Sequence, residues 1–191
     1  MPIGPTPQLK ASMFGRMPVG GPKPAGGGPA APKPPPGVRL EHRIGIQASP
    51  EVIWQTIVDL PSWEAWNPLY PKAVGEIRIG GVLDLTLALP GQAPRQIQPT
   101  VLEWVPNEQL HWRLTMLGGF IKSVRYLEIE QLAEASCIVS NGEIFGGLMG
   151  PSIARRMGRS IHRGFREMNE ALKARAEATW RTAEGGPTSS R

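Results

Sequence analysis

Cysteine is almost missing from this chain of 191 residues, which contains only Cys137. One thiol excludes an internal disulfide framework and cannot by itself form a thiolate metal site. The histidines are His42, His111 and His162, and they show no metal-ligand spacing, so we expect no metal and no other cofactor. The chain also lacks the run of about 18 apolar residues that a membrane span needs, and it lacks a secretory signal. We therefore expect a soluble protein of the cytoplasm.

Acidic side chains are missing from residues 1–40, which carry five Lys or Arg. Residues 41–149 carry 7 basic and 12 acidic side chains, whereas residues 150–181 carry 8 and 3. The net charge of +5 therefore comes from a tail and one helical segment. A nucleic-acid surface would interleave exposed aromatic side chains with its arginines, and here Phe165 falls among the apolar residues instead. We expect no nucleic-acid partner.

The composition divides the chain into three parts. Residues 1–37 are rich in proline, glycine and alanine, and such a segment cannot bury enough apolar surface to offset its ordering entropy. We expect a disordered basic tail there, one folded domain over residues 38–180, and a disordered C-terminus over residues 181–191.

Residues 150–178 predict a single long amphipathic helix. Pro151 suits its first turn, where no backbone N–H is needed. The apolar residues recur every three or four positions and share one stripe, namely Ile153, Met157, Ile161, Phe165, Met168 and Leu172. The opposite face carries five arginines, Arg155, Arg156, Arg159, Arg163 and Arg166. Because the apolar stripe must be covered, we expect it to pack on the strands upstream.

The upstream region predicts seven strands and one short helix. Alternation from Val38 predicts a first strand, and Ser49-Pro50-Glu51 predicts the start of a helix that Pro61 closes. Turn signals then separate six strand segments, at 72–79, 82–89, 95–105, 109–117, 121–130 and 135–145. Short connections between consecutive strands favour an antiparallel meander.

Five short segments, in this order, resemble the START-like or SRPBCC superfamily, in particular its bacterial polyketide cyclase/dehydrase-type members. They are Ala48–Trp54, Trp66-Asn67-Pro68, Leu110-His111-Trp112, Glu143–Gly147 and Gly164–Leu172. The resemblance covers about residues 38–178. It implies an α+β helix-grip fold, in which a curved antiparallel sheet wraps a long C-terminal helix and leaves an apolar cavity. Relatives bind lipids, quinones or polyketides, and some cyclise polyketides, so the fold leaves the function open.

Alternation within the last two strands selects the side chains that would face such a cavity. Arg125 and Leu127 share a face of one strand, and Asn141 and Glu143 share a face of the next. A turn near residues 132–133 would pair Arg125 with Asn141 and leave Glu143 diagonal to Arg125. Because an ionised carboxylate is costly in an apolar cavity, Glu143 should either pair with Arg125 or have a raised pKa. We favour a structural ion pair, with a ligand-polarising pair as the alternative.

The expected ligand contacts are these two charged residues and the surrounding wall. The full set is Trp66, Leu85, Leu87, Trp112, Met116, Phe120, Arg125, Leu127, Asn141, Glu143, Phe145, Met149, Ile153, Met157 and Ile161. We expect His111 to point away from Trp112 toward solvent.

Three functions stay open from the sequence. The favoured hypothesis is non-catalytic binding of a hydrophobic small molecule such as a lipid, a quinone or a polyketide-like compound. The alternative is a polyketide cyclase, aromatase or dehydratase with Glu143 as general acid/base and Arg125 as the anion-holding group. A third hypothesis is a membrane-associated or assembly factor that uses the basic tail and the face of Arg155, Arg156 and Arg159. The oligomeric state is not predicted.

Overall fold

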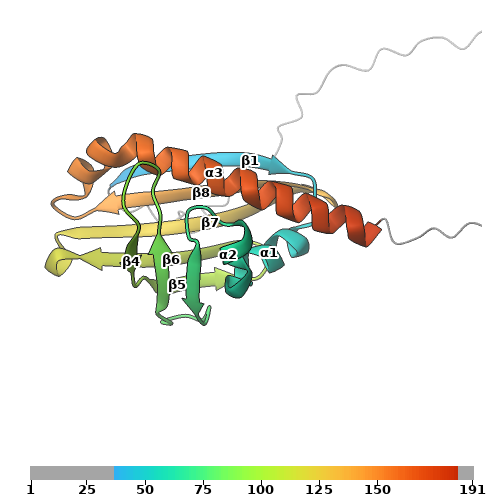
Figure 1. The fold of residues 1–191 in the computed structure, drawn as a ribbon, viewed down its shortest axis with the longest axis horizontal. Coiled ribbons are helices and arrows are strands. Elements are labelled where there is room, and N and C mark those ends of the chain that lie inside the picture. The colour runs from blue at the N-terminus through green and yellow to red at the C-terminus, as the bar shows by residue number, and fades with distance from the viewer. Residues whose placement is uncertain (1–36, 185–191) are drawn as a thin grey trace, which may run out of the picture. The chain divides into compact units, whose positions relative to one another are not determined.

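The computed structural model describes residues 37–184 (Figure 1). The predictions for the tail before residue 37 and for the chain after residue 184 lie outside the described residues.

The order of elements begins with strand β1 and ends with the long helix α3 (Figure 1). Between them lie one short helix, one further helical turn, two 3₁₀ turns and seven strands. Their bounds are β1 Val38–Ile46, α1 Pro50–Val58, η1 Leu60–Ser62, α2 Trp63–Trp66, β2 Lys72–Gly75, β3 Leu83–Leu87, β4 Arg95–Ile97, β5 Thr100–Val105, β6 Gln109–Met116, η2 Leu117–Gly119, β7 Ile121–Ala133, β8 Ser136–Gly146 and α3 Gly150–Glu184.

All strand pairs are antiparallel. One sheet has the order β1-β8-β7-β6-β5 and the other has the order β2-β3-β4. A bridge between Val82 and Thr100 and a hydrogen bond from the Leu83 amide to the Pro99 carbonyl join the two sheets. Together they form a curved antiparallel surface along which α3 lies, packed mainly on β1 and β8 (Figure 1). This arrangement is the α+β helix-grip fold, and it confirms the predicted fold class.

The structure has eight strands in the described region rather than the seven we predicted. The segment predicted as one strand over residues 95–105 is two strands, β4 and β5, which belong to different sheets. The break falls at Gln98 and Pro99, because proline has no amide N–H to donate to a ladder. Strand β2 ends at Gly75 instead of residue 79, since Gly75 has a φ of 136° that bends the chain out of the ladder.

Helix α1 begins where the sequence indicated. The Ser49 side chain accepts a hydrogen bond from the Val52 amide, and Pro50 occupies the first helical position. The helix ends at Val58, and Pro61 lies within the following 3₁₀ turn rather than at the helix end itself.

Helix α3 continues six residues past the predicted end at residue 178. Ala176 is fully buried and Trp180 packs against the core, so the apolar stripe does not stop at Leu172. Glu177 also accepts a hydrogen bond from the Gln47 amide, which ties this part of the helix to the end of β1. Residues 181–184, which we assigned to the disordered C-terminus, are therefore helical.

Tertiary packing buries one face of α3 against the sheets. Ile161, Phe165, Met168 and Leu172 are all buried, as the apolar stripe predicts. Across residues 37–184, no helix combines the length and the apolar character needed to cross a bilayer.

Candidate functional site

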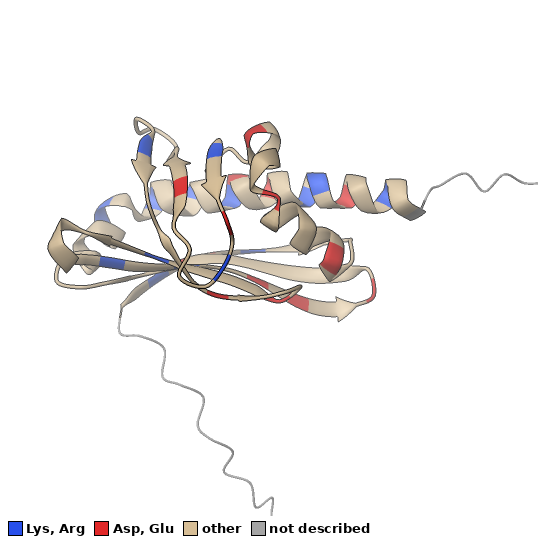
Figure 2. Cartoon of the chain, turned by 90° about the horizontal axis from the view of Figure 1, so that it is seen from below, with Lys and Arg blue, Asp and Glu red and all other residues tan. Residues whose placement is uncertain are grey.

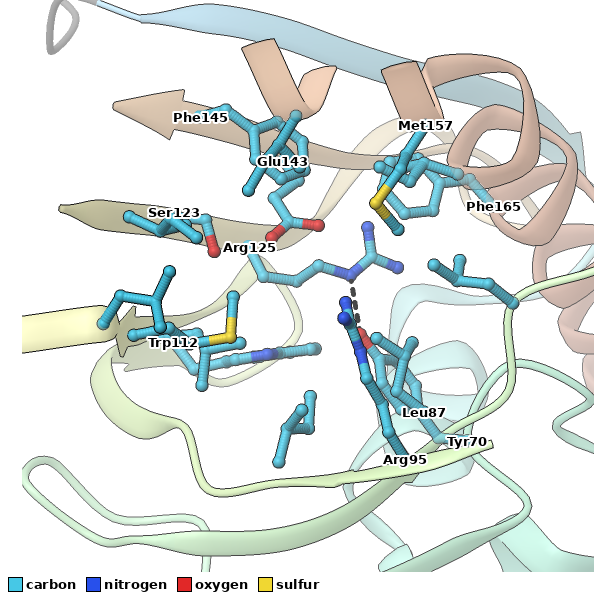
Figure 3. A pocket seen from close by; sticks show the side chains of 18 residues that line it. Tyr70, Leu87, Arg95, Trp112, Ser123, Arg125, Glu143, Phe145, Met157 and Phe165 are labelled. Atoms are coloured by element: carbon cyan, nitrogen blue, oxygen red, sulfur yellow. Dashed lines mark hydrogen bonds between the residues drawn. The ribbon is translucent and has the colours of Figure 1, made fainter. Parts of the chain in front are cut away.

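A cavity of about 290 Å³ lies between α3 and the two sheets (Figure 3). Eighteen residues line it, from β3, β4, β6, β7, β8, α3 and the loops beside them. Most of the lining is apolar, and the polar side chains are Tyr70, Arg95, Ser123, Arg125 and Glu143. A mostly apolar wall with a few converging polar groups is typical of a small-molecule site.

The register of the last hairpin places Arg125 directly opposite Glu143, and Leu127 opposite Asn141. This pairing is shifted by two residues from the one we predicted, because the strands continue to the pair Ala133 and Ser136 through an irregularity after Gln131. A shift of two residues preserves the faces, since side chains alternate with a period of two. Both Arg125 and Glu143 therefore extend into the cavity (Figure 3).

Arg125 is the most deeply buried charged residue of the site, with 2% of its surface exposed. Its Nε donates to the Tyr70 hydroxyl at 3.2 Å, and its Nη1 donates to the Gly142 carbonyl at 3.2 Å. Its Nη2 lies 3.9 Å from the Met168 sulfur. The guanidinium carbon lies 3.8 Å from the centre of the Phe165 ring, a cation–π geometry. The orientation of this side chain is thus fixed by neutral groups.

The expected ion pair between Arg125 and Glu143 does not form. Over residues 37–184, no carboxylate oxygen lies within 4.0 Å of the Arg125 guanidinium. The guanidinium instead bonds Tyr70 and the backbone of Gly142, which draws it away from the carboxyl. Without this partner, Glu143 follows the other expectation, a raised pKa. Burial raises the pKa of Glu143, and Arg125, the Ser123 hydroxyl and Arg95 act in the opposite direction.

Tyr70 adds a hydroxyl donor to the same group. The ring is 3% exposed, and burial raises the pKa of the Tyr70 phenol, opposed by the charge of Arg125. Since the phenol keeps its proton, the hydroxyl can donate to a ligand while it accepts from Arg125. Arg125 and Tyr70 therefore present hydrogen-bond donors to the cavity beside one weakened acid, Glu143.

The sequence of this chain matches a known protein family. Residues 37–177 match the family model described as polyketide cyclase / dehydrase and lipid transport. The chain belongs to this family. The match confirms the resemblance to SRPBCC and START-like proteins that the sequence motifs indicated.

Solved structures share the fold of this polyketide cyclase/dehydrase family member at low sequence identity. An aromatase/cyclase from Streptomyces sp. R1128 gives a TM-score of 0.62 at 17% identity, covering 79% of this chain and 99% of its own. A START superfamily protein from Mycobacterium smegmatis gives 0.58 at 20% identity, covering 74% and 98%. A norcoclaurine synthase point mutant from Thalictrum flavum, in complex with a transition-state analogue, gives 0.57 at 14% identity, covering 74% and 95%. No curated protein matches the chain.

Nine of the expected ligand contacts line the cavity of this family member. They are Leu87, Trp112, Met116, Arg125, Glu143, Phe145, Ile153, Met157 and Ile161. Alternation on the strands and the apolar stripe of the helix were sufficient to identify them.

Four expected contacts lie outside the cavity lining, three of them buried and Trp66 half-buried. Leu85 and Leu127 are core residues with at most 1% exposure. Trp66 packs edge-on against Trp63. Asn141 has no exposed surface, and its amide donates to Asn169 at 2.8 Å, so it anchors α3 to β8 instead of facing a ligand.

Phe120 and Met149 were also expected to contact the ligand, and both face solvent. Phe120 is 55% exposed and Met149 is 43% exposed. They lie in two adjacent loops, where the Met149 amide donates to the Phe120 carbonyl at 3.0 Å. Strand alternation does not extend into such loops, so the pattern placed these side chains incorrectly.

Sequence reasoning missed the other nine lining residues. These are Tyr70, Leu89, Arg95, Ile97, Leu114, Leu117, Ile121, Ser123 and Phe165. Alternation with Arg125 and Trp112 would have found Ser123, Ile121 and Leu114. Arg95 and Ile97 come from the short strand that we merged with β5, and Tyr70 comes from a loop without periodicity, so no pattern identified them.

His111 lies outside the cavity. It is on the opposite face of β6 from Trp112, which packs against Tyr70. It is half-buried rather than fully exposed, because Glu128 lies 3.1 Å from its Nε2 and Glu103 lies 3.8 Å from its Nδ1. Among the described residues, no three His, Cys, Asp or Glu side chains are grouped as metal ligands would be.

Proposed function

We propose that this protein binds a small hydrophobic molecule, such as a lipid, quinone or polyketide-like compound, in the cytoplasm. The observation that carries the proposal is the cavity between α3 and the sheets, whose wall is mostly apolar and whose few polar side chains include the buried Arg125. Membership of a family that includes lipid transport supports it. The buried, unpaired thiol of Cys137 fits a reducing compartment.

Native mass spectrometry of the purified protein, followed by organic extraction, tests the proposal. We expect a defined small molecule that dissociates on activation. Replacing Met157, which lines the cavity from α3, by tryptophan should fill the space and remove the bound mass. The matched control is R166W, which places the same side chain on the exposed face of the same helix and should leave the bound mass unchanged.

Two results would contradict binding. One is an empty protein whose unfolding temperature does not change with any of a panel of lipids, quinones and aromatic polyketides. The other is an equal amount of bound molecule in the wild type, M157W and R166W, which would place the molecule outside this cavity.

A second candidate function is cyclisation or dehydration of a polyketide-like substrate. The observation that favours it is the position of Glu143, whose carboxyl lines a largely apolar cavity opposite Arg125 on the neighbouring strand. Burial there raises the pKa of Glu143, which favours a carboxyl that can donate a proton. Arg125 and Tyr70 would hold an enolate or carbonyl oxygen of the substrate. The similarity in fold to an aromatase/cyclase supports this candidate.

The variant E143Q distinguishes the two functions. A binding protein should retain its ligand with a modest change in affinity, since glutamine has nearly the shape of the protonated acid. An acid/base enzyme should lose most of its turnover, by a factor of about 10²–10⁴, while it still binds substrate. Retained turnover in E143Q would rule out Glu143 as the acid/base.

A further inference from the structure

The guanidinium of Arg125 is a buried positive charge with unused hydrogen-bonding capacity. A guanidinium has about five N–H donors and keeps its charge in proteins. In the part of the chain that the structure describes, three groups accept from it, namely the Tyr70 hydroxyl, the Gly142 carbonyl and, more weakly, the Met168 sulfur. All three are neutral, so they satisfy hydrogen bonds without balancing the charge.

Burial of an unbalanced charge is costly. The effective penalty is several kcal/mol for each ion, and a nearby opposite charge is the usual compensation. The Phe165 ring face supplies part of it through the cation–π contact. Among the described residues that line the cavity, Glu143 is the single carboxyl, and its oxygens lie more than 4.0 Å from the guanidinium nitrogens of Arg125.

The cavity remains positive in either protonation state of Glu143. Arg95 also lines it, from β4 at the solvent-exposed side. Two arginines against one carboxyl give a net charge of +1 when Glu143 is ionised and +2 when it is protonated. Figure 3 shows Arg95 reaching toward Tyr70, whose hydroxyl accepts from Arg125.

We propose that the ligand is an amphipathic acid whose carboxylate binds Arg125 and whose apolar body fills the rest of the cavity. This inference rests on the proposed binding function and names the chemical class of the ligand. The volume of the cavity sets the size of the part of the ligand that it can enclose. At about 30 Å³ for a water-sized group, 290 Å³ holds about ten non-hydrogen atoms, the size of octanoate.

Calorimetry of the full-length protein with octanoate and with octan-1-ol, at pH 8, tests the inference. The two probes have the same chain length and differ in charge. A charge-assisted hydrogen bond to a buried guanidinium should make octanoate bind at least about tenfold more tightly. The variant R125Q should remove this preference, so that octanoate binds no more tightly than octan-1-ol.

Two further variants separate the role of Arg125 from a general effect of charge. R113Q removes an arginine from the exposed outer face of β6 and should leave the preference unchanged. E143Q removes the carboxyl that faces Arg125, so its affinity for octanoate should be at least that of the wild type. Weaker octanoate binding in E143Q would contradict the inference even if R125Q fails to fold.

The outcomes for the two probes are distinct. Equal or weaker binding of octanoate relative to octan-1-ol overturns the inference, as does a preference that survives in folded R125Q. Binding of octan-1-ol alone would leave the proposed function standing. If neither probe binds and extraction finds nothing, both proposals fail.

A separate observation concerns the surface beside the cavity. Four large apolar side chains, which we call the apolar tip, are exposed together: Leu117 63%, Phe120 55%, Leu148 80% and Met149 43%. The hydrogen bond between the Met149 amide and the Phe120 carbonyl holds the two loops side by side. Leu117 also lines the cavity, so the tip adjoins the binding site.

The charge around the apolar tip has one sign. Residues 109–127 and 144–166 contain no aspartate or glutamate. Lys122, Arg155 and Arg156 are exposed there, and within the described chain no carboxylate lies within 4.0 Å of them. Figure 2 shows basic segments at the N-terminal end of α3 and on neighbouring strand ends.

We infer that the apolar tip docks onto an anionic lipid bilayer. Exposed apolar side chains beside a basic surface match the layered chemistry of a membrane interface, where acyl chains lie beneath anionic head groups. The residues of this surface are independent of Arg125, so the two inferences stand or fall separately.

Cosedimentation of the full chain with phosphatidylcholine vesicles, with and without about a quarter phosphatidylglycerol, tests the docking. We expect binding to the anionic vesicles, and a loss of at least about fivefold in F120S/L148S and in R155Q/R156Q. The matched controls are L132S, an exposed leucine on the β7–β8 hairpin, and R163Q, an arginine near Glu167, and both should bind as the wild type does.

Unchanged binding in F120S/L148S and R155Q/R156Q would overturn the docking inference. Loss of a wild-type dimer in F120S/L148S, seen by size-exclusion chromatography without any vesicle binding, would assign the tip to a second copy of the chain and overturn it as well.

Discussion

The hydroxyl of Tyr126 lies directly over Gly142, its partner on the neighbouring strand, in the space that a Cβ would occupy. The hydroxyl donates to Glu41 at 2.6 Å and accepts from Arg39 at 2.6 Å, so its position is fixed from the β1 side. The carbonyl of the same glycine accepts from Arg125 on the cavity side. Gly142 thus links the outer packing of β8 to the position of the buried guanidinium.

The variant G142A should destabilise the protein by about 1–3 kcal/mol, because the added methyl group forces the Tyr126 ring out of place. Chemical denaturation measures the loss. G45A is the matched control, since Gly45 lies in β1 with no atom within 4 Å of an added Cβ, and it should change stability by less than about 0.5 kcal/mol. Equal effects of the two substitutions would contradict the steric role of Gly142.

Asn169 on α3 should matter for stability and not for ligand binding. Its Oδ1 accepts from Asn141 at 2.8 Å, and its Nδ2 donates to the His42 carbonyl at 3.0 Å. N169A leaves buried polar groups unsatisfied and should cost about 1–3 kcal/mol in unfolding free energy. Because the two asparagines share one hydrogen bond, N141A/N169A should lose less than the sum of the single variants. A loss of ligand affinity in folded N169A would contradict this assignment.

The pH dependence of stability should report Glu143. Burial raises the pKa of its carboxyl, so the folded state holds this proton more tightly than the unfolded state does. The stability that the protonated Glu143 carboxyl gives to the folded state is fully present below its ordinary pKa. It is lost as pH rises from there through the raised pKa. The wild type should therefore match E143Q near about pH 4 and be less stable than E143Q near about pH 8.

Urea titrations of both proteins across this range measure the difference. E108Q, which removes an exposed carboxyl at the β5–β6 turn, reports the general effect of one surface charge. Stability curves of the wild type and E143Q that run parallel at all pH values would show that Glu143 has the same pKa in both states.

The N-cap of α1 provides a test of a local sequence signal. Ser49 is 8% exposed, and its hydroxyl accepts from the Val52 amide at 3.4 Å. S49A should cost about 1 kcal/mol in thermal or chemical unfolding, whereas S49T, which keeps a capping hydroxyl, should cost less. An equal loss in both variants would attribute the effect to packing at this site.

The candidate site could be predicted only where regular elements supply it. Arg125 and Glu143 alternate with outward residues on adjacent strands, so a period of two was enough to place both in the cavity even with the register wrong. Tyr70 and Arg95 could not be found this way, because one lies in a loop and the other on a strand of the second sheet. The hydrogen bond between Arg125 and Tyr70 joins positions 55 residues apart, and no local pattern encodes it.

The sequence by itself determined the local elements of this protein. The apolar stripe from Ile153 to Leu172 specified the long helix, and Ser49-Pro50 specified the start of α1, because periodicity and capping depend on neighbours in the chain. Tertiary structure alone decided that Arg125 has no carboxylate partner among residues 37–184. That outcome depends on which of several neighbours the long side chain reaches after the sheets and α3 have packed, and packing fixes it through contacts distant in sequence.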